Sequence, residues 1–391
     1  MILSARTYGM ALLSGAVLLS GCMPAYRAAP EQAQVTTPSG WIGTSSEGTV
    51  VDSAWWTAFN DPGLSAVVEA ALARNNDILS AATRIEQARA AVQLADSSLG
   101  PSLAFDTGAH AERALGPGGM AISRAVQPAL QLNWELDLWG RLSSQAKAAE
   151  LKLSATQADY DAIALSVASE TARTYIALLG LNAQLQQAKA TSTSRTEALR
   201  LAQEKFDAGY ISQLELTQAQ SELEAVEQHI PQLELAISRH HNALRLLSGE
   251  LPAAYEQNAP STLSALVLPA PGAGLPSELL RRRPDIARAE LGLASRDASL
   301  EASRAAFLPQ VSLAARAGAL YVSALSYDPT KIWSLGGSIL APIFDRGRLQ
   351  AQFDSATAQR DEAAFAYRGV VLTAFSEVEN ALAGQGRFAE E

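Results

Sequence analysis

The sequence predicts a mainly α-helical fold that also contributes four β-strands to a membrane. Three observations support this prediction. Residues 130–138 alternate apolar and polar side chains without a break, as a strand with one dry and one wet face does. No proline occurs between Pro128 and Pro231, so a very long helix can form there. The chain also repeats itself at an offset of 207 or 208 residues, which indicates two similar structural units.

Composition and charge narrow the class of protein. Of the 391 residues, 48% are hydrophobic but only 6% are aromatic, which suits long, closely packed helices. The formal net charge of -10 argues against nucleic acid as a partner, because phosphate binding needs a basic surface. Cys22 is the only cysteine, so no disulfide can form within the chain.

The N-terminus has the pattern of a secretory signal. The apolar run Met10–Ser20 is too short to span a bilayer as a mature helix. Leu19-Ser20-Gly21-Cys22 resembles a bacterial lipobox, which implies a signal peptide at 1–21 and acylation of Cys22. An ordinary signal peptide with an incidental cysteine remains the alternative. Residues 22–75 are expected to form a polar tether followed by a short amphipathic helix around Trp55-Trp56 and Leu64–Leu72.

The first repeat is expected to span 76–250 as a helix, two strands and a long helical hairpin. The predicted strands, Leu103–Ala109 and Val126–Leu138, are joined by a loop at about 114–124. A helix from Arg141 to about Ala208 would be roughly 100 Å long. Gly209 is predicted to end it, and Pro231 to bend the return helix. The return helix carries a coiled-coil seam at Leu216, Ala219, Leu223, Val226, Ile230, Leu233, Ile237, Leu244 and Leu247.

The second repeat is expected at 284–391, after a linker at 251–283 rich in proline and alanine. Gly140-Arg141-Leu142 matches Gly347-Arg348-Leu349, and the order of matching positions is preserved along the chain. Its strands are predicted on either side of a loop at about 322–331. The last strand has apolar positions at Trp333, Leu335, Gly337, Ile339, Ala341 and Ile343. By comparison with the first repeat, about 65 residues are expected to be missing, including the final helix.

The dry faces of the strands are predicted to contact lipid. Two hairpins in one chain form an open sheet, and a bilayer does not tolerate unpaired strand edges. Several chains would therefore have to close one barrel. The predicted strand Val126–Leu138 is long enough for the ~9–11 residues that a tilted membrane strand needs. The wet face would line a water-filled lumen, with Gln131, Asn133, Glu135 and Asp137 as pore-lining residues.

Several motifs resemble the lipoprotein branch of TolC-like outer-membrane factors, which belong to RND-type tripartite efflux systems. They are WELDLWGR (134–141), FDAGYISQLELTQAQ (206–220), GLPSELLRRRPDIARAE (274–290), AFLPQVSL (306–313) and AFSEVENAL (374–382). The resemblance covers almost the whole chain from Trp55 onward. It implies a homotrimer with a twelve-stranded barrel, to which each chain gives four strands, and a long coiled-coil tunnel of antiparallel helices.

The same resemblance implies partners. The helical tips would dock to a periplasmic adaptor, the membrane fusion protein, and through it to an inner-membrane RND-type pump. The residues expected to contact the adaptor are Gly209, Tyr210, Ile211, Ser212 and Leu214. A plain solvated turn is the alternative, since a turn needs the glycine in any case. Truncation would leave the second hairpin without its tip, which in the family narrows the periplasmic entrance.

No catalytic, cofactor or metal site is expected. His229 and His240 are three helical turns apart, roughly 16 Å, which is too far to share a metal. Glu135 and Asp137 fit a lumen wall better than an acid–base pair. GPGG at 116–119 is a loop tip and does not link a strand to a helix as a phosphate loop does. Arg281-Arg282-Arg283 is expected to form salt bridges around the following helix.

The sequence therefore predicts a passive, lipid-anchored outer-membrane channel subunit with a large periplasmic part. It would catalyse no reaction and would export drugs or other small toxic compounds, with energy from the partner pump. Two alternatives remain open at this stage. One is an outer-membrane duct for protein or peptide export, and the other is a periplasmic coiled-coil lipoprotein that forms no channel.

Overall fold

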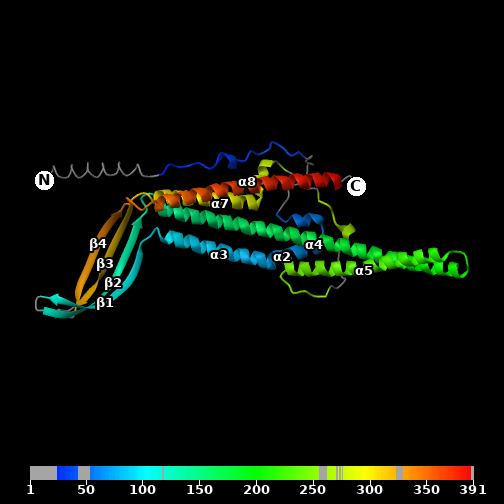
Figure 1. Cartoon of the computed structure of the whole chain (residues 1–391), viewed down its shortest axis with the longest axis horizontal. Helices are drawn as coiled ribbons and strands as arrows, with labels where there is room; N and C mark the ends of the chain where they lie inside the picture. Colours follow the sequence, from blue (N-terminus) through cyan, green and yellow to red (C-terminus); the bar gives the residue numbers. More distant parts are fainter. Residues whose placement is uncertain are drawn as a thin grey trace. The chain divides into compact units, whose positions relative to one another are not determined.

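The structure, a computed structural model, describes residues 24–42, 53–116, 119–254, 262–269, 272, 274, 276–322 and 329–388 (Figure 1). Cys22 and the predicted signal peptide lie outside these residues. The chain divides into two compact units, and each unit draws on both sequence repeats. The first unit comprises Met1–Thr37, Arg84–Ala158 and Asp285–Phe375; the second comprises Pro38–Thr83, Asp159–Pro284 and Ser376–Glu391.

The order helix, strand, strand, helix occurs twice along the chain. The main elements are α2 (Pro62–Arg74), α3 (Asn76–Ser97), β1 (Ser102–Gly116), β2 (Gly119–Leu136), α4 (Arg141–Asp207), α5 (Gln213–Leu247), α6 (Pro276–Arg282), α7 (Pro284–Ala305), β3 (Gln310–Val322), β4 (Thr330–Leu340) and α8 (Arg348–Phe388). Short 3-10 turns lie at η2 (Glu31–Ala33), η3 (Trp55–Phe59) and η4 (Leu263–Ala265). None of the helices in the described part of the chain has the length and apolar character that crossing a membrane requires.

Helices α4 and α5 form the predicted antiparallel hairpin. Helix α4 has 67 residues, so the predicted helix from Arg141 to about Ala208 is confirmed. In the second unit, ion pairs join Lys189 to Glu234 and Arg195 to Glu222, as expected for neighbouring helices that run in opposite directions. Helix α5 continues through Pro231. Four seam positions of α5 are buried: Leu216, Leu233, Ile237 and Leu244.

The core of the second unit lies where α2 packs against this hairpin. Leu64 and Val68 of α2 contact a cluster that includes Leu185 of α4 and Ile237 of α5. The predicted amphipathic helix over Leu64–Leu72 is confirmed within α2. Trp55 and Trp56 belong to the separate turn η3, because Asp61 caps a new helix by accepting from the amides of Gly63 and Leu64.

The four strands form one antiparallel sheet in the order β1-β2-β3-β4 (Figure 1). The predicted loop at about 114–124 is wrong, because β1 and β2 stay paired as far as Gly116 opposite Gly119. The predicted end of β2 at Leu138 is also wrong: the strand ends at Leu136, since Asp137 turns to cap α4. Strand β4 ends at Leu340, before Pro342, which has no amide proton for a ladder. Ala341 and Ile343 therefore lie outside the strand in which they were predicted.

Candidate functional site

The strand register places one apolar face on the sheet. Residues directly opposite each other in adjacent strands share a face. Leu103 is opposite Leu132, Leu132 is opposite Ala315, and Ala315 is opposite Leu335, so one apolar row crosses all four strands. The next row is Phe105, Leu130, Ala317 and Trp333, and further members of the face are Val126, Trp134, Leu136, Val311, Leu313, Tyr321 and Ile339.

Much of this apolar face is exposed among the residues that the structure describes. Trp333 is 82% exposed, Leu335 75% and Phe105 67%. Monomeric proteins rarely leave a contiguous apolar patch of this kind in water. Strands β1 and β4 are also edge strands, and each pairs on one side only among the described residues. In a bilayer, lipid would cover the apolar face. The unpaired edges of β1 and β4 would still need partner strands, because no water is present there to bond their backbone groups.

The opposite face of the sheet is polar. Gln131 and Asn133, two of the predicted pore-lining residues, lie on it, and Gln131 donates to Asn133 over 3.5 Å. Arg316 of β3 stands opposite Gln131 and pairs with Asp106 of β1 at 2.9 Å. Neither Asp106 nor Arg316 was predicted. The alternation within each strand places Asp106 and Arg316 on the polar side of their own strands. Their proximity to each other and to Gln131 depends on the register of three strands.

The other two predicted pore-lining residues lie where the sheet joins α4. Glu135 is on the polar face and pairs with Arg141, whose Nη2 contacts both carboxylate oxygens at 2.7 and 2.8 Å. Asp137 lies beyond β2 and accepts from the amides of Leu142 and Ser143 at 2.9 and 2.8 Å. Asp137 therefore caps the first turn of α4, a role that its alternation with Glu135 did not reveal.

The second repeat has an equivalent junction. Asp345 accepts from the amides of Gly347 and Leu349, both at 3.0 Å, at the start of α8. Gly140 and Gly347 both have positive φ, 75° and 84°. The matching Gly-Arg-Leu motifs thus encode the same turn from strand to helix, with a carboxylate at the helix N-terminus. The aspartate lies one position closer to the glycine in the second repeat.

The turn between α4 and α5 is where adaptor contacts were predicted. Gly209 has φ 78°, its amide bonds to the Phe206 carbonyl, and the amide of Tyr210 bonds to the Lys205 carbonyl. These two bonds form a Schellman motif, which ends a helix at a glycine. Ser212 and Glu215 then start α5 with a capping box. Hydrogen bonds thus hold the turn on both sides, and it exposes Tyr210 by 82% and Leu214 by 67% while Ile211 is half-buried.

The histidine pair of α5 and the arginine triplet make local contacts in the structure. His240 bonds to the Ala236 carbonyl at 2.9 Å within α5. Burial, and then the neighbouring Arg245, lower the pKa of His241. In the stretches that the structure covers, no three His, Cys, Asp or Glu residues lie close enough to hold a metal ion. Arg282 and Arg283 of the arginine triplet form the expected kind of salt bridge, with Glu278 and Glu377.

The sequence model of the outer membrane efflux protein family matches residues 67–250 and 275–391. The chain belongs to this family. It is 32% identical to the pyoverdine export outer membrane protein OpmQ of Pseudomonas aeruginosa, over 95% of the chain and 80% of that relative. It is also 32% identical to the solvent efflux pump outer membrane protein SrpC of Pseudomonas putida, over 96% and 82% of the two chains.

The solved structures agree with this assignment. The outer-membrane channel OprN superposes with a TM-score of 0.82 at 30% identity, over 94% of this chain and 83% of that channel. The predicted resemblance to TolC-like outer-membrane factors and the predicted fold class are therefore confirmed. The chain is therefore an outer-membrane efflux channel, as predicted. Its relatives favour this function over a duct for peptide export and over a coiled-coil lipoprotein that forms no channel.

Proposed function

We propose that three copies of the chain close one twelve-stranded barrel, and that small toxic compounds leave the cell through it. The apolar row that crosses all four strands carries this proposal. The row would face lipid in the barrel, and each β1 edge would pair with a β4 edge of the next copy. The polar face with Gln131, Asn133 and the Asp106–Arg316 pair would line the lumen.

Electron microscopy and conductance of the detergent-extracted full chain test the barrel. The expected result is a trimeric particle that gives a steady conductance in a planar lipid bilayer. A monomeric rod without conductance would remove the channel proposal. The substrate class rests on the relatives, which are named for pyoverdine and solvent export. Deleting the gene should therefore sensitise the cell to apolar organic compounds.

We further propose that the α4–α5 turn contacts a periplasmic adaptor, which connects the channel to an RND-type pump. The turn at Gly209–Leu214 supports this assignment, because hydrogen bonds hold its backbone while Tyr210 and Leu214 are exposed. A photo-crosslinking amino acid placed at Leu214 should capture the adaptor in cells. Leu246 is the matched control, because it is also a leucine of α5 and is similarly exposed, 70% against 67%. Equal capture at both positions would contradict a specific contact at the turn.

Lipid anchoring through Cys22 is the third part of the proposal, and the lipobox-like Leu19–Cys22 supports it. The mature N-terminal peptide should carry diacylglycerol and a third acyl chain on Cys22. Mass spectrometry of the wild type and of Cys22→Ala measures this directly. A mature N-terminus at any other residue, or an unmodified cysteine, would exclude the anchor.

A further inference from the structure

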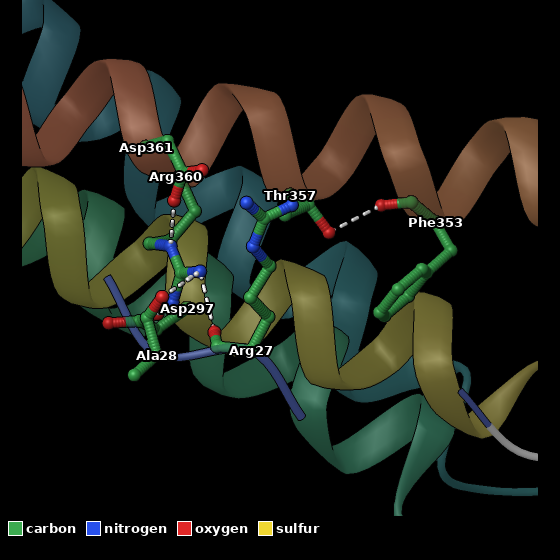
Figure 2. Close-up of polar contacts among 7 residues, drawn as sticks. All are labelled: Arg27, Ala28, Asp297, Phe353, Thr357, Arg360 and Asp361. Atoms are coloured by element: carbon green, nitrogen blue, oxygen red, sulfur yellow. Dashed lines mark hydrogen bonds and ion pairs between the residues drawn. The ribbon is translucent and has the colours of Figure 1, made fainter. Parts of the chain in front are cut away.

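Arg360 of α8 is a fully buried arginine whose side chain has four polar partners. Its Nε donates to Asp361 at 2.8 Å, and its Nη1 donates to Asp297 of α7 at 3.3 Å. Its Nη2 donates to two main-chain carbonyls, those of Arg27 at 2.6 Å and Ala28 at 3.2 Å (Figure 2). A buried guanidinium is stable only when paired in this way, so these carbonyls satisfy donors that the two carboxylates leave open.

A second arginine holds the same N-terminal segment. Arg304 of α7 donates from Nε to the carbonyl of Pro24 at 2.8 Å. We name residues 24–28 the strap. The side chains of the strap do not provide these contacts: Tyr26 is 54% exposed, and those of Arg27 and Ala28 are also exposed. The two arginines therefore bind the main chain of the strap.

The spacing of these contacts gives the strap a direction. Asp297 and Arg304 are seven residues apart on α7, or about 10 Å along its axis. Pro24 and Ala28 are four residues apart, or about 13 Å in an extended chain. The strap thus runs antiparallel to α7, beside α7 and α8 in Figure 1. Its first residue lies at the end of α7 that leads into β3, where the apolar face begins at Val311.

We propose that Arg360, together with Arg304, is a clamp that positions the N-terminal lipid anchor beside the membrane end of the sheet. This inference rests on the proposed acylation of Cys22. Cys22 precedes Pro24 by two residues, so its reach from the clamped Pro24 is about 7 Å at most. The anchor and the apolar face of the sheet then enter the same bilayer surface, and the strap that follows the anchor is held against α7 and α8.

Trypsin provides the first test, because its cleavage site after Arg27 is the peptide group that Arg360 holds. In folded wild-type protein this bond should be cut slowly, since a protease needs the strap to detach first. Arg360→Met should accelerate the cut at least tenfold, seen as a new N-terminus at Ala28. Arg360→Lys should lie between the two, because one ammonium group cannot reach all four acceptors.

Arg296→Met is the matched control. Arg296 is an exposed arginine of α7 that bonds to Gln359 and does not contact the strap, so its loss should leave cleavage at Arg27 unchanged. Equal acceleration by both variants would overturn the clamp. If Arg360→Met fails to fold, the wild-type protein alone still tests the clamp. Trypsin cleavage after Arg27 that is as fast in the native protein as in denaturant would also overturn the clamp.

A fluorophore on Tyr26→Cys tests whether the clamp fixes the segment that follows the anchor. Its anisotropy should be high in the otherwise wild-type protein and clearly lower with Arg360→Met, because a released strap stays tethered through Cys22 but rotates freely. Equal anisotropy in both proteins would overturn the positioning role. Mass spectrometry of Cys22 reports acylation independently, so a missing lipid and a missing clamp give different results: an unmodified Cys22 with a protected Arg27 bond would refute the anchor alone.

Discussion

Asp106 and Arg316 form an ion pair over strand β2, with 2.9 Å between the carboxylate Oδ2 and the guanidinium Nη2. Asp106 belongs to β1 and Arg316 to β3, so the pair connects two strands that share no backbone hydrogen bonds. It lies on the polar face, next to Gln131. This pair places fixed charges of both signs on the wall that we assign to the lumen.

Neutralising one partner should change the ion preference of the channel more than its stability. The side chains are 44% and 34% exposed, so the pair contributes about 1 kcal/mol or less. Asp106→Asn should shift the reversal potential in a salt gradient toward anion preference, and Arg316→Met toward cation preference. Shifts of the same sign in the two variants would contradict a lumenal position for the pair.

A charge on the apolar face should prevent insertion. Leu130 lies midway along the apolar side of β2, between Val126 and Leu136. Leu130→Lys should cost about 2–4 kcal/mol near the bilayer midplane. The measurement is the fraction of heat-modifiable trimer in the outer membrane. Asn133→Lys, on the polar face of the same strand, should leave this fraction nearly unchanged, and an equal loss in both variants would exclude the assignment of the two faces.

Removing the cap of α4 should destabilise the junction between sheet and helix. Asp137→Ala should lower the free energy of unfolding by about 0.5–2 kcal/mol. Asp161→Ala is the control, because Asp161 is exposed within the same helix. Denaturant unfolding in detergent measures both variants. An Asp137 variant as stable as the Asp161 variant would show that the cap contributes nothing.

The same cap should make stability depend on pH in the acid range. Burial acts to raise the pKa of Asp137, but hydrogen bonds from Ser143 and Leu142 outweigh it, and the pKa lies below its usual value. A lowered folded-state pKa gives stability that is complete above the unfolded value and is lost as pH falls through the folded value. The stability difference between wild type and Asp137→Ala should therefore be constant near neutral pH and shrink below about pH 4.

Two glycines of α4 and its turn should respond oppositely to alanine. Gly209 has positive φ, so Gly209→Ala should cost about 1–2 kcal/mol. Gly180 lies inside α4, and among the described residues an added Cβ meets no side chain and no other element within 4 Å. Gly180→Ala should therefore stabilise the helix by about 0.5–1 kcal/mol. Thermal unfolding of both proteins checks the signs. A Gly209→Ala variant as stable as the wild type would refute the assigned role of Gly209, and destabilisation by Gly180→Ala would refute the expected gain in the helix.

Local patterns predicted the periodic elements because their signals lie within a few residues. The absence of proline between Pro128 and Pro231 identified α4, and the steps of three and four residues along the seam identified α5. The two-residue period identified β2, and Gly209 located the turn. The ends of β2 and β4 were less accurate. The alternation of apolar and polar residues continues in the sequence past Leu136. In the structure Asp137 caps α4 and does not extend β2. A pattern of alternation cannot show that a residue is needed as a helix cap.

By itself, the sequence determined which face of each strand is apolar, how long the helical hairpin is and which family the motifs resemble. Each of these depends on spacing along one segment of chain. Only the tertiary structure decided that Asp106 reaches Arg316 and that Arg360 holds the carbonyls of Arg27 and Ala28. Such contacts join residues 210 and more than 330 positions apart, and main-chain carbonyls are present in every sequence. Their pairing follows from register and packing, which no local pattern encodes.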